Sequence, residues 1–147
     1  MMTLTQAVTI LMIEDDDGHA RLIEKNIRRA GVFNDLVHLR DGSRAVEFLF
    51  GADDGARAEH GPFMILLDLN LPDMSGVDIL RRVKADERFR RAPVIVLTTT
   101  DDKAEIKRCY DLGCNVYITK PLIYQDFADA IRQLGLFLSV IQIPEQI

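Results

Sequence analysis

The sequence predicts an α/β protein built on a doubly wound, parallel sheet of five strands with helices on both faces. Five short apolar runs recur along the chain, and each is followed by a segment with helical spacing. This alternation is typical of parallel strands joined by crossover helices. The runs are continuously apolar, as expected of strands that are covered on both faces. At 147 residues the chain has the size of one domain.

The elements follow one another in a regular order. The first strand is predicted at Val8–Ile13. In the helix after it, Ala20, Ile23 and Ile27 recur at intervals of three and four residues, and Gly31 ends the helix because glycine readily turns left-handed. The later elements are strands at Leu36–Leu39, Phe63–Leu67, Val94–Leu97 and Asn115–Ile118, helices at Ser43–Phe50, Ser75–Lys84, Asp102–Leu112 and from Tyr124 past Leu138, and a long surface loop at Gly51–Pro62.

The composition excludes several classes of protein. Hydrophobic residues make up 48% and charged residues 28%, which excludes a disordered chain, a fibre and a disulfide scaffold. The 23 acidic and 18 basic residues give a net charge of −5, which argues against nucleic-acid binding because that requires clustered positive charge. No apolar run approaches the length of a membrane span and no signal peptide is evident, so we expect a cytoplasmic protein that does not bind membranes. Cys109 and Cys114 are expected to be buried free thiols.

Polar side chains stand at the carboxyl ends of four predicted strands. They are Glu14 and Asp15, Asp68, Thr98, and Lys120. Because ligands of open parallel sheets bind beyond the carboxyl ends of the strands, we expect these side chains to converge on one site. Three carboxylates in one place repel one another unless a cation neutralises them, and a set of oxygen ligands favours Mg²⁺ over Zn²⁺.

This set of residues suits the chemistry of phosphoryl groups. The carboxylates contribute a charge of roughly −3, and Lys120 with one Mg²⁺ offsets it, so the site is close to neutral before an anion arrives. The Asp68 carboxylate is a competent nucleophile for forming an aspartyl phosphate. Thr98 can donate a hydrogen bond to a phosphoryl oxygen.

Other polar residues near these strands have simpler interpretations. Asp16 and Asp17 are predicted to cap the first helix, since carboxylates are favourable at a helix N-terminus. No sequence signal pairs His19 or His38 with a nucleophile, so both are interpreted as structural or solvated.

Four stretches of the sequence resemble the receiver domain of bacterial two-component response regulators. They are Ile-Glu-Asp-Asp at 13–16, Leu-Asp-Leu-Asn-Leu-Pro at 67–72 followed by Gly76, Leu-Thr-Thr at 97–99 and Tyr-Ile-Thr-Lys-Pro at 117–121. The resemblance covers about residues 8–138. It implies a flavodoxin-like sheet with the strand order 2-1-3-4-5, and a phosphoprotein that transmits a signal rather than an enzyme.

The resemblance also implies a role for each acidic residue. Asp68 accepts the phosphoryl group. Asp15 and Asp68 bind Mg²⁺ through their side chains, Asn70 binds it through its backbone carbonyl, and Glu14 binds it through a water molecule. Mn²⁺ or Ca²⁺ can take the place of Mg²⁺.

The remaining residues of the motifs concern the response to phosphorylation. Lys120 pairs with the phosphoryl group, and the Lys120–Pro121 peptide bond is expected to be cis. Thr99 is a small residue after the switch threonine, which leaves the phosphate accessible. Thr98 and Tyr117 form the switch pair: charge on Asp68 draws Thr98 inward and Tyr117 fills the space that it leaves.

A narrower resemblance points to the partner. The long loop before the third strand, the run Leu97–Thr100, the segment 110–121 and the apolar tail are similar to stand-alone regulators that pair with bacterial and cyanobacterial phytochrome kinases. This similarity implies a sensor histidine kinase of the phytochrome type as the phosphodonor. A phosphorelay intermediate and a motility regulator remain alternatives.

The end of the chain suggests how the signal is passed on. We expect one receiver domain over residues 1–147, with a core at about 8–138 and a C-terminal arm at about 139–147. About 26 residues follow Pro121, too few for an output domain, so the output is expected to be a change of the domain's own surface. Surplus apolar residues suggest a homodimer through the final helix and the arm, with contacts at Leu136, Phe137, Val140, Ile141 and Ile143. The alternative is a tail folded over its own domain.

Three rival functions fit the sequence less well. A Mg²⁺-dependent phosphatase of the haloacid dehalogenase type also uses a strand-end aspartate, but it requires a second aspartate where this chain has Asn70, and a cap domain. A flavin carrier of the flavodoxin type requires a phosphate loop after the first strand, where acidic residues stand instead. A dinucleotide site is excluded because the sequence has no G-x-G-x-x-G.

Overall fold

The computed structural model describes residues 2–3, 8–51, 62–121, 123–138 and 142–143. Its centre is a parallel sheet of five strands in the order β3-β2-β4-β5-β6. The strands are β2 (Thr9–Ile13), β3 (Leu36–Leu39), β4 (Phe63–Leu67), β5 (Val94–Thr98) and β6 (Val116–Thr119). Counted among themselves they have the order 2-1-3-4-5, which confirms the predicted flavodoxin-like sheet.

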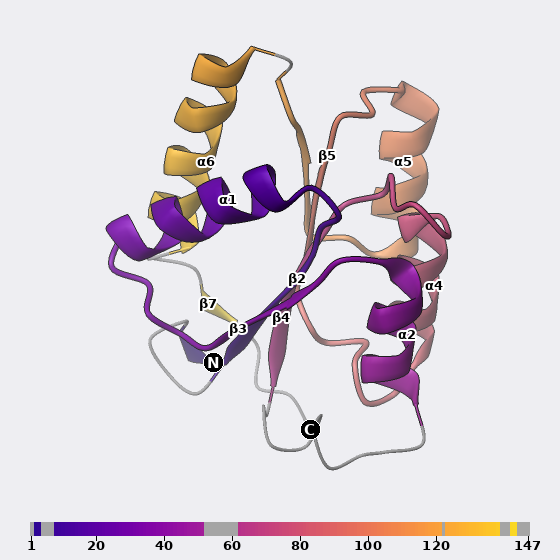
Figure 1. Ribbon diagram of the computed structural model, residues 1–147. Helices are drawn as coiled ribbons and strands as arrows, with labels where there is room; N and C mark the ends of the chain where they lie inside the picture. Colours follow the sequence, from indigo (N-terminus) through magenta and orange to yellow (C-terminus); the bar gives the residue numbers. More distant parts are fainter. Residues whose placement is uncertain (1, 4–7, 52–61, 122, 139–141, 144–147) are drawn as a thin grey trace.

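Helices cover both faces of this sheet (Figure 1). One face carries α1 (Asp17–Arg29) and α6 (Tyr124–Leu138), and the other carries α2 (Gly42–Phe50), α4 (Gly76–Ala85) and α5 (Lys103–Leu112). Successive side chains of β2 point into alternate layers, so that Ile10 and Met12 pack with α1 and α6 whereas Leu11 and Ile13 pack with the other helices. The continuously apolar strands therefore serve two cores at once.

Short-range signals set the ends of the helices. The side chains that accept a backbone N–H at a helix N-terminus are those of Asp16, Asp41, Ser75 and Asp102. Gly113 ends α5 in a left-handed conformation with a φ of 108°. The capping role predicted for Asp16 is confirmed, and Asp17 follows it in the first turn of α1.

Two elements were not expected from the sequence. β1 (Met2–Thr3) pairs antiparallel with β7 (Gln142–Ile143), so at this point the C-terminal arm contacts the start of its own chain. This pairing corresponds to the alternative in which the tail folds back on its own domain. Of the predicted dimer contacts, Leu136 is exposed on α6, while Val140, Ile141 and the side chains of Phe137 and Ile143 lie outside the described residues. The predicted loop at 51–62 also lies outside them, except for its two end residues.

Two predictions from composition can be compared with the structure. Cys109 and Cys114 are buried free thiols, as expected. Within the described ranges, none of the helices has the length and apolar character needed to span a bilayer.

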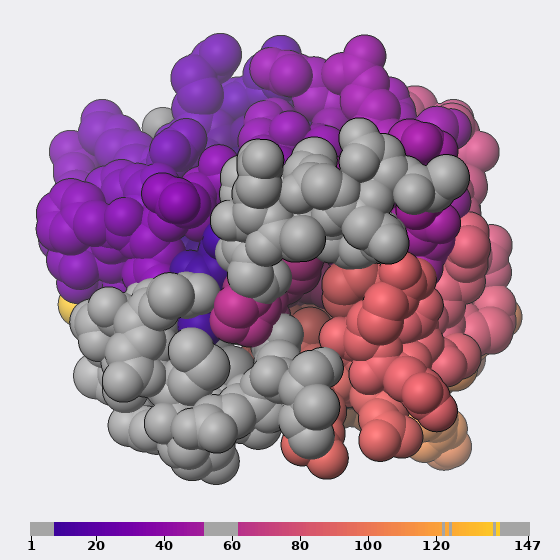
Figure 2. Space-filling view, turned by 90° about the horizontal axis from the view of Figure 1, so that it is seen from below, coloured from indigo at the N-terminus to yellow at the C-terminus, as the bar shows by residue number. Residues whose placement is uncertain are grey.

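The parallel direction of the strands gives the molecule two different ends. The carboxyl ends of all five strands meet at the upper edge of the sheet in Figure 1. Figure 2 views the opposite end. At the loop between α4 and β5, a hollow of about 370 Å³ is lined by one acidic and three basic residues, namely Glu87, Arg88, Arg90 and Arg91. The basic hollow therefore lies away from the edge at which the strand-end acids meet.

One glycine holds the chain close to the end of β4. The backbone N–H of Gly76 donates to the carbonyl of Leu69 at 2.9 Å, which fixes the start of α4 beside Asp68. A Cβ atom on Gly76 would lie only 2.4 Å from the carbonyl oxygen of Asp68 and 2.7 Å from the Cα of Leu69. Since both neighbours are backbone atoms, neither can move aside without displacing the strand end.

We predict that Gly76→Ala lowers the free energy of unfolding by about 2 kcal/mol, because overpacking against backbone costs stability. Urea denaturation followed by circular dichroism measures this change. Gly31→Ala is the control: Gly31 has a φ of 87° and no atom within 4 Å of an added Cβ, so only its conformation is strained, at about 1 kcal/mol. Equal stabilities of Gly76→Ala and the wild type would show that the close approach is unimportant.

Candidate functional site

The structure brings the five predicted strand-end side chains to one edge of the sheet. Glu14 and Asp15 follow β2, Asp68 follows β4, Thr98 ends β5 and Lys120 follows β6. Glu14, Asp68, Thr98 and Lys120 are almost fully buried, with exposed fractions of 2%, 7%, 0% and 3%, whereas Asp15 is exposed. Polar groups with so little solvent must find partners within the protein.

Lys120 is the centre of this cluster. Its ammonium group donates hydrogen bonds to the carboxylates of Glu14 and Asp68, and the distance from Nζ to Asp68 Oδ2 is 3.1 Å. A third contact, of 3.2 Å, joins Nζ to Nδ1 of His19. A lysine ammonium has three N–H donors. In this site each of them has an acceptor.

The two buried acids are held in the same way, each by Lys120 and by a backbone N–H two residues later in the chain. Burial raises the pKa of the Glu14 carboxyl, while the hydrogen bond and the charge of Lys120 oppose that rise. The second oxygen of Glu14 accepts the N–H of Asp16 at 3.2 Å. Asp68 accepts from Lys120 with Oδ2 and from the backbone N–H of Asn70 with Oδ1, at 3.0 Å. Both oxygens of each carboxylate are therefore oriented by the protein.

The acids at this edge have the arrangement of a cation site. Glu14, Asp15 and Asp68 each offer one carboxylate oxygen, and these three atoms lie within 4.8 Å of one another. Oxygen donors at this density suit a hard divalent ion such as Mg²⁺, Mn²⁺ or Ca²⁺. Three of the four residues predicted as ligands, Glu14, Asp15 and Asp68, thus fit a divalent cation by type and by position.

The side chain of Asn70 has a role that the sequence did not reveal. Its amide nitrogen lies 3.2, 3.1 and 3.2 Å from the hydroxyl oxygens of Thr98, Thr99 and Thr100. A polar side chain two residues after Asp68, opposite a run of three threonines, was the available signal. Through these contacts Asn70 ties the segment after β4 to the end of β5.

Thr98 and Tyr117, the predicted switch pair, lie on neighbouring strands. The Tyr117 hydroxyl donates to the backbone carbonyl of Thr100 at 2.6 Å. Burial, with the neighbouring negative charges, raises the pKa of Tyr117 to about 12, so the phenol keeps the proton that it donates. In the described structure the Thr98 hydroxyl bonds to Asn70 and not to Tyr117, so Thr100 and Asn70 connect the two residues.

The two histidines were interpreted as structural or solvated, and for His19 that interpretation missed a contact with the site. His19 lies in the first turn of α1, and its ring contacts both Lys120 and Phe127. Its place four residues after Asp15 was the only hint in the sequence. His38 lies 2.7 Å from the backbone carbonyl of Glu14 through Nε2 and so supports the strand end.

One expectation about the backbone is wrong. The Lys120–Pro121 bond is trans, as is every other peptide bond of the described residues. Trans is the lower-energy form of a peptide bond before proline.

The fold and site define a domain with a parallel five-stranded sheet and a buried lysine among strand-end acids, and comparisons with known proteins identify the family. The model of the response regulator receiver domain matches residues 10–132. This chain belongs to the receiver domain family of response regulators.

Three solved structures illustrate the similarity. A response regulator receiver domain from Rhodospirillum rubrum is 63% identical, with a TM-score of 0.86, and the match covers 94% of this chain and 98% of that one. Response regulator Rcp1 of Synechocystis is 32% identical over 136 residues, 92% of each chain. The Mn²⁺-bound form of Rcp1 gives a TM-score of 0.82 over 93% of this chain and 99% of that one. The phosphorylated cyanobacterial phytochrome response regulator RcpA is 33% identical, with a TM-score of 0.83, over 93% of this chain and 98% of that one.

We predict that Lys120→Met lowers the free energy of unfolding by about 3 kcal/mol in the absence of divalent cations, because it leaves two buried carboxylates without their cation. Urea denaturation in the presence of a chelator measures the change. Lys107→Met is the matched control, since Lys107 makes an exposed ion pair with Asp111 and its loss should leave stability close to that of the wild type. Equal losses in the two variants would contradict a special role for the buried ammonium.

Proposed function

We propose that this protein is a response regulator that accepts a phosphoryl group on Asp68 from a sensor histidine kinase and signals by a conformational change. The observation that carries the proposal is the setting of Asp68. It is a buried carboxylate with one oxygen held by the ammonium of Lys120 and the other by the N–H of Asn70, beside two further acids that fit a divalent cation. The family membership supports the same function.

In the proposed reaction, Asp68 is the nucleophile. A bond forms between a carboxylate oxygen of Asp68 and phosphorus, while the bond from phosphorus to the donor histidine nitrogen breaks and that nitrogen keeps the electron pair. Lys120 donates to the transferred group and offsets its charge. We assign no other enzymatic activity to the chain.

The cation in this proposal is Mg²⁺, with Mn²⁺ or Ca²⁺ as substitutes. Asp15, Asp68 and the backbone carbonyl of Asn70 would bind it directly, and Glu14 would bind it through water. When bound, the ion supplies positive charge that stabilises the phosphoryl oxygens. The existence of a Mn²⁺-bound form of the relative Rcp1 supports a divalent ion for this chain.

The conformational response is proposed to begin at the threonine run. A phosphoryl group on Asp68 offers oxygens to which the Thr98 hydroxyl can donate, in competition with its contact to Asn70. Thr99, exposed beside it, leaves the approach to Asp68 open. Movement of Thr98 would loosen Thr100, whose carbonyl holds the Tyr117 hydroxyl, so Tyr117 would be free to turn inward.

We further propose that the kinase is of the phytochrome type. RcpA, a cyanobacterial phytochrome response regulator, matches 93% of this chain at 33% identity, which supports this partner. Two-component regulation by such a kinase is also consistent with action in the cytoplasm, where buried free thiols remain reduced. Transfer to a further histidine protein, or control of motility, would use the same site with a different partner.

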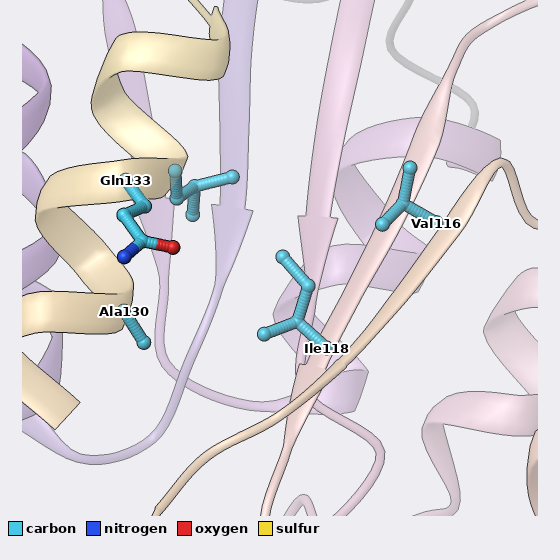
Figure 3. Close-up of a pocket in the computed structure, with 5 residues that line it drawn as sticks. Val116, Ile118, Ala130 and Gln133 are labelled. Carbon is cyan, nitrogen blue, oxygen red and sulfur yellow. The ribbon is translucent and has the colours of Figure 1, made fainter. Parts of the chain in front are cut away.

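We also propose that the protein forms a homodimer through α6 and the C-terminal arm. An apolar groove of about 350 Å³ lies between α6 and the edge strand β6, with Val116 and Ile118 on the strand facing Ala130 and Gln133 on the helix (Figure 3). Leu136, further along α6, has 56% of its surface exposed. Apolar surface of this kind supports an association site.

The first prediction of this proposal concerns phosphorylation. A small phosphodonor such as acetyl phosphate, with Mg²⁺, should add one phosphoryl group, detected by intact-mass spectrometry. Asp68→Asn should abolish the product, while the control Asp78→Asn, at an exposed residue paired with Arg81, should leave it unchanged. Asp15→Asn should weaken Mg²⁺ binding by at least about tenfold, because it removes one of the charged ligands. A phosphoryl group on the Asp68→Asn protein would contradict the assignment.

The partner is identified by phosphotransfer profiling. Purified histidine kinases of the organism that carries this protein are phosphorylated with labelled ATP and mixed with the regulator for short times. The appearance of label on Asp68 is then followed. We expect a phytochrome kinase to transfer fastest. Preferential transfer from another kinase would reject the phytochrome pairing and retain the receiver function.

The second prediction concerns the dimer. Leu136→Glu, or removal of residues 140–147, should reduce the solution mass from dimer to monomer in sedimentation equilibrium, because a charge or a missing arm removes apolar contact area. Gln125→Glu places the same charge at another exposed position of α6 and should leave the mass unchanged. If both the Leu136→Glu protein and the shortened protein remained dimeric, the proposed interface would be wrong. A monomeric wild type would reject the dimer itself.

A further inference from the structure

The hydrogen bonds of Lys120 include one acceptor that does not belong to the sheet. Glu14 and Asp68 stand at strand ends, but His19 is on α1 and contacts Nζ at 3.2 Å through Nδ1. Because an ammonium group can only donate, Nδ1 accepts and the ring proton is on Nε2. Among the three acceptors of Lys120, His19 is therefore the one that itself lies on a helix.

The same ring contacts α6. The centroids of the His19 and Phe127 rings are 4.7 Å apart, with an interplanar angle of 48°. Phe127 is buried in the first turns of α6 and belongs to the core between that helix and the sheet. One imidazole thus accepts a hydrogen bond from the site lysine and contacts Phe127 near the start of α6.

A groove borders α6 along its middle. Near its C-terminal end, α6 is fixed on α1 by close approach: a Cβ on Gly135 would lie 2.7 Å from the carbonyl oxygen of Asn26. Between α6 and β6, in contrast, lies the apolar groove that Figure 3 shows. The helix is thus held closely to α1 near one end, contacted by the His19 ring near the other, and bordered by the groove at Ala130, Gln133 and Leu134.

We propose that His19 is a positioning residue that couples the hydrogen bonding of the Lys120 ammonium to the position of α6. The inference rests on the proposed phosphorylation of Asp68. A phosphoryl group competes for the donors of Lys120, and bonds between charged groups are stronger than a bond to a neutral imidazole, so the contact to His19 is the one given up. The released ring loses its fixed orientation against Phe127, and α6 shifts toward the groove.

This route is separate from the threonine and tyrosine pair. Tyr117 packs with the core under α2, α4 and α5, whereas Phe127 packs with the core under α1 and α6. Phosphorylation of Asp68 would thereby change the structure on both faces of the sheet, through Thr98 and Tyr117 on one face and through His19 on the other.

Two substitutions of His19 separate its two contacts. His19→Gln retains an acceptor for Lys120 but removes the ring, and His19→Phe retains a ring against Phe127 but removes the acceptor. Lys25→Gln, at an exposed residue of the same helix, is the control. His19 is itself partly exposed, with 37% of its side chain accessible, so these variants should fold.

The readouts are methyl NMR shifts on adding Mg²⁺ and beryllofluoride, and the rate of phosphorylation by acetyl phosphate. In the wild type and in Lys25→Gln, we expect the methyl signals of Ile131 and Leu134 on α6 and of Leu112 on the opposite face to shift. In both His19 variants the shifts of Ile131 and Leu134 should be lost while that of Leu112 remains. His19→Gln should keep the wild-type rate of phosphorylation, and His19→Phe should change it.

Specific results would overturn the coupling. Shifts of Ile131 and Leu134 that persist in both His19 variants, or that are absent from the wild type while Leu112 responds, would show that His19 does not link the site to α6. A wild type that is neither phosphorylated on Asp68 nor altered by beryllofluoride would reject the proposed function, and the inference with it.

Discussion

The burial of one ammonium group constrains much of this structure. Lys120 has 3% of its surface exposed, and a cation at that depth is stable only when every N–H has an acceptor. Two of the acceptors are acids, which must reach the lysine from different strands, and the strands must therefore end at the same level. The parallel sheet meets this requirement, since β2, β4 and β6 all deliver their carboxyl ends to one edge. The acids in turn make that edge attractive to a divalent ion.

What could be predicted from the sequence depended on short-range signals and on one general rule of topology. Apolar runs and capping residues placed the elements, and some strand ends differ from the prediction by one residue. Asn115, for example, was predicted to begin the last strand, but it lies just before β6 and exchanges hydrogen bonds with the backbone of Val94. The rule that ligands bind at the carboxyl ends of parallel strands then brought Glu14, Asp68 and Lys120 together. The contacts of His19 with Lys120 and Phe127, the Asn70 bridge to the threonines and the pairing of β1 with β7 join residues far apart in sequence. No local pattern encodes such side-chain geometry.

The site and the helices are linked by individual hydrogen bonds and ring contacts, which suits the proposed response to one added phosphoryl group. Asn70 and Tyr117 hold the segment after β5 from two sides, and His19 stands between the lysine and α6. Each link is a hydrogen bond or a ring contact at the rim of a tightly packed core, so a change of partner at the site alters surface elements without disturbing the sheet. The groove beside α6 provides the space that such a shift requires.

A crystal structure of the protein with Mg²⁺ and beryllofluoride, a stable mimic of a phosphoryl group, tests this description most directly. We predict beryllofluoride on an Asp68 oxygen, with fluorine atoms within hydrogen-bond distance of Lys120 Nζ and Thr98 Oγ1, and the cation bound by Asp15 and Asp68. We also predict that Nζ no longer contacts Nδ1 of His19. Beryllofluoride bound elsewhere, or bound to Asp68 with the contacts of Lys120 unchanged, would contradict a site in which the buried lysine exchanges partners on phosphorylation.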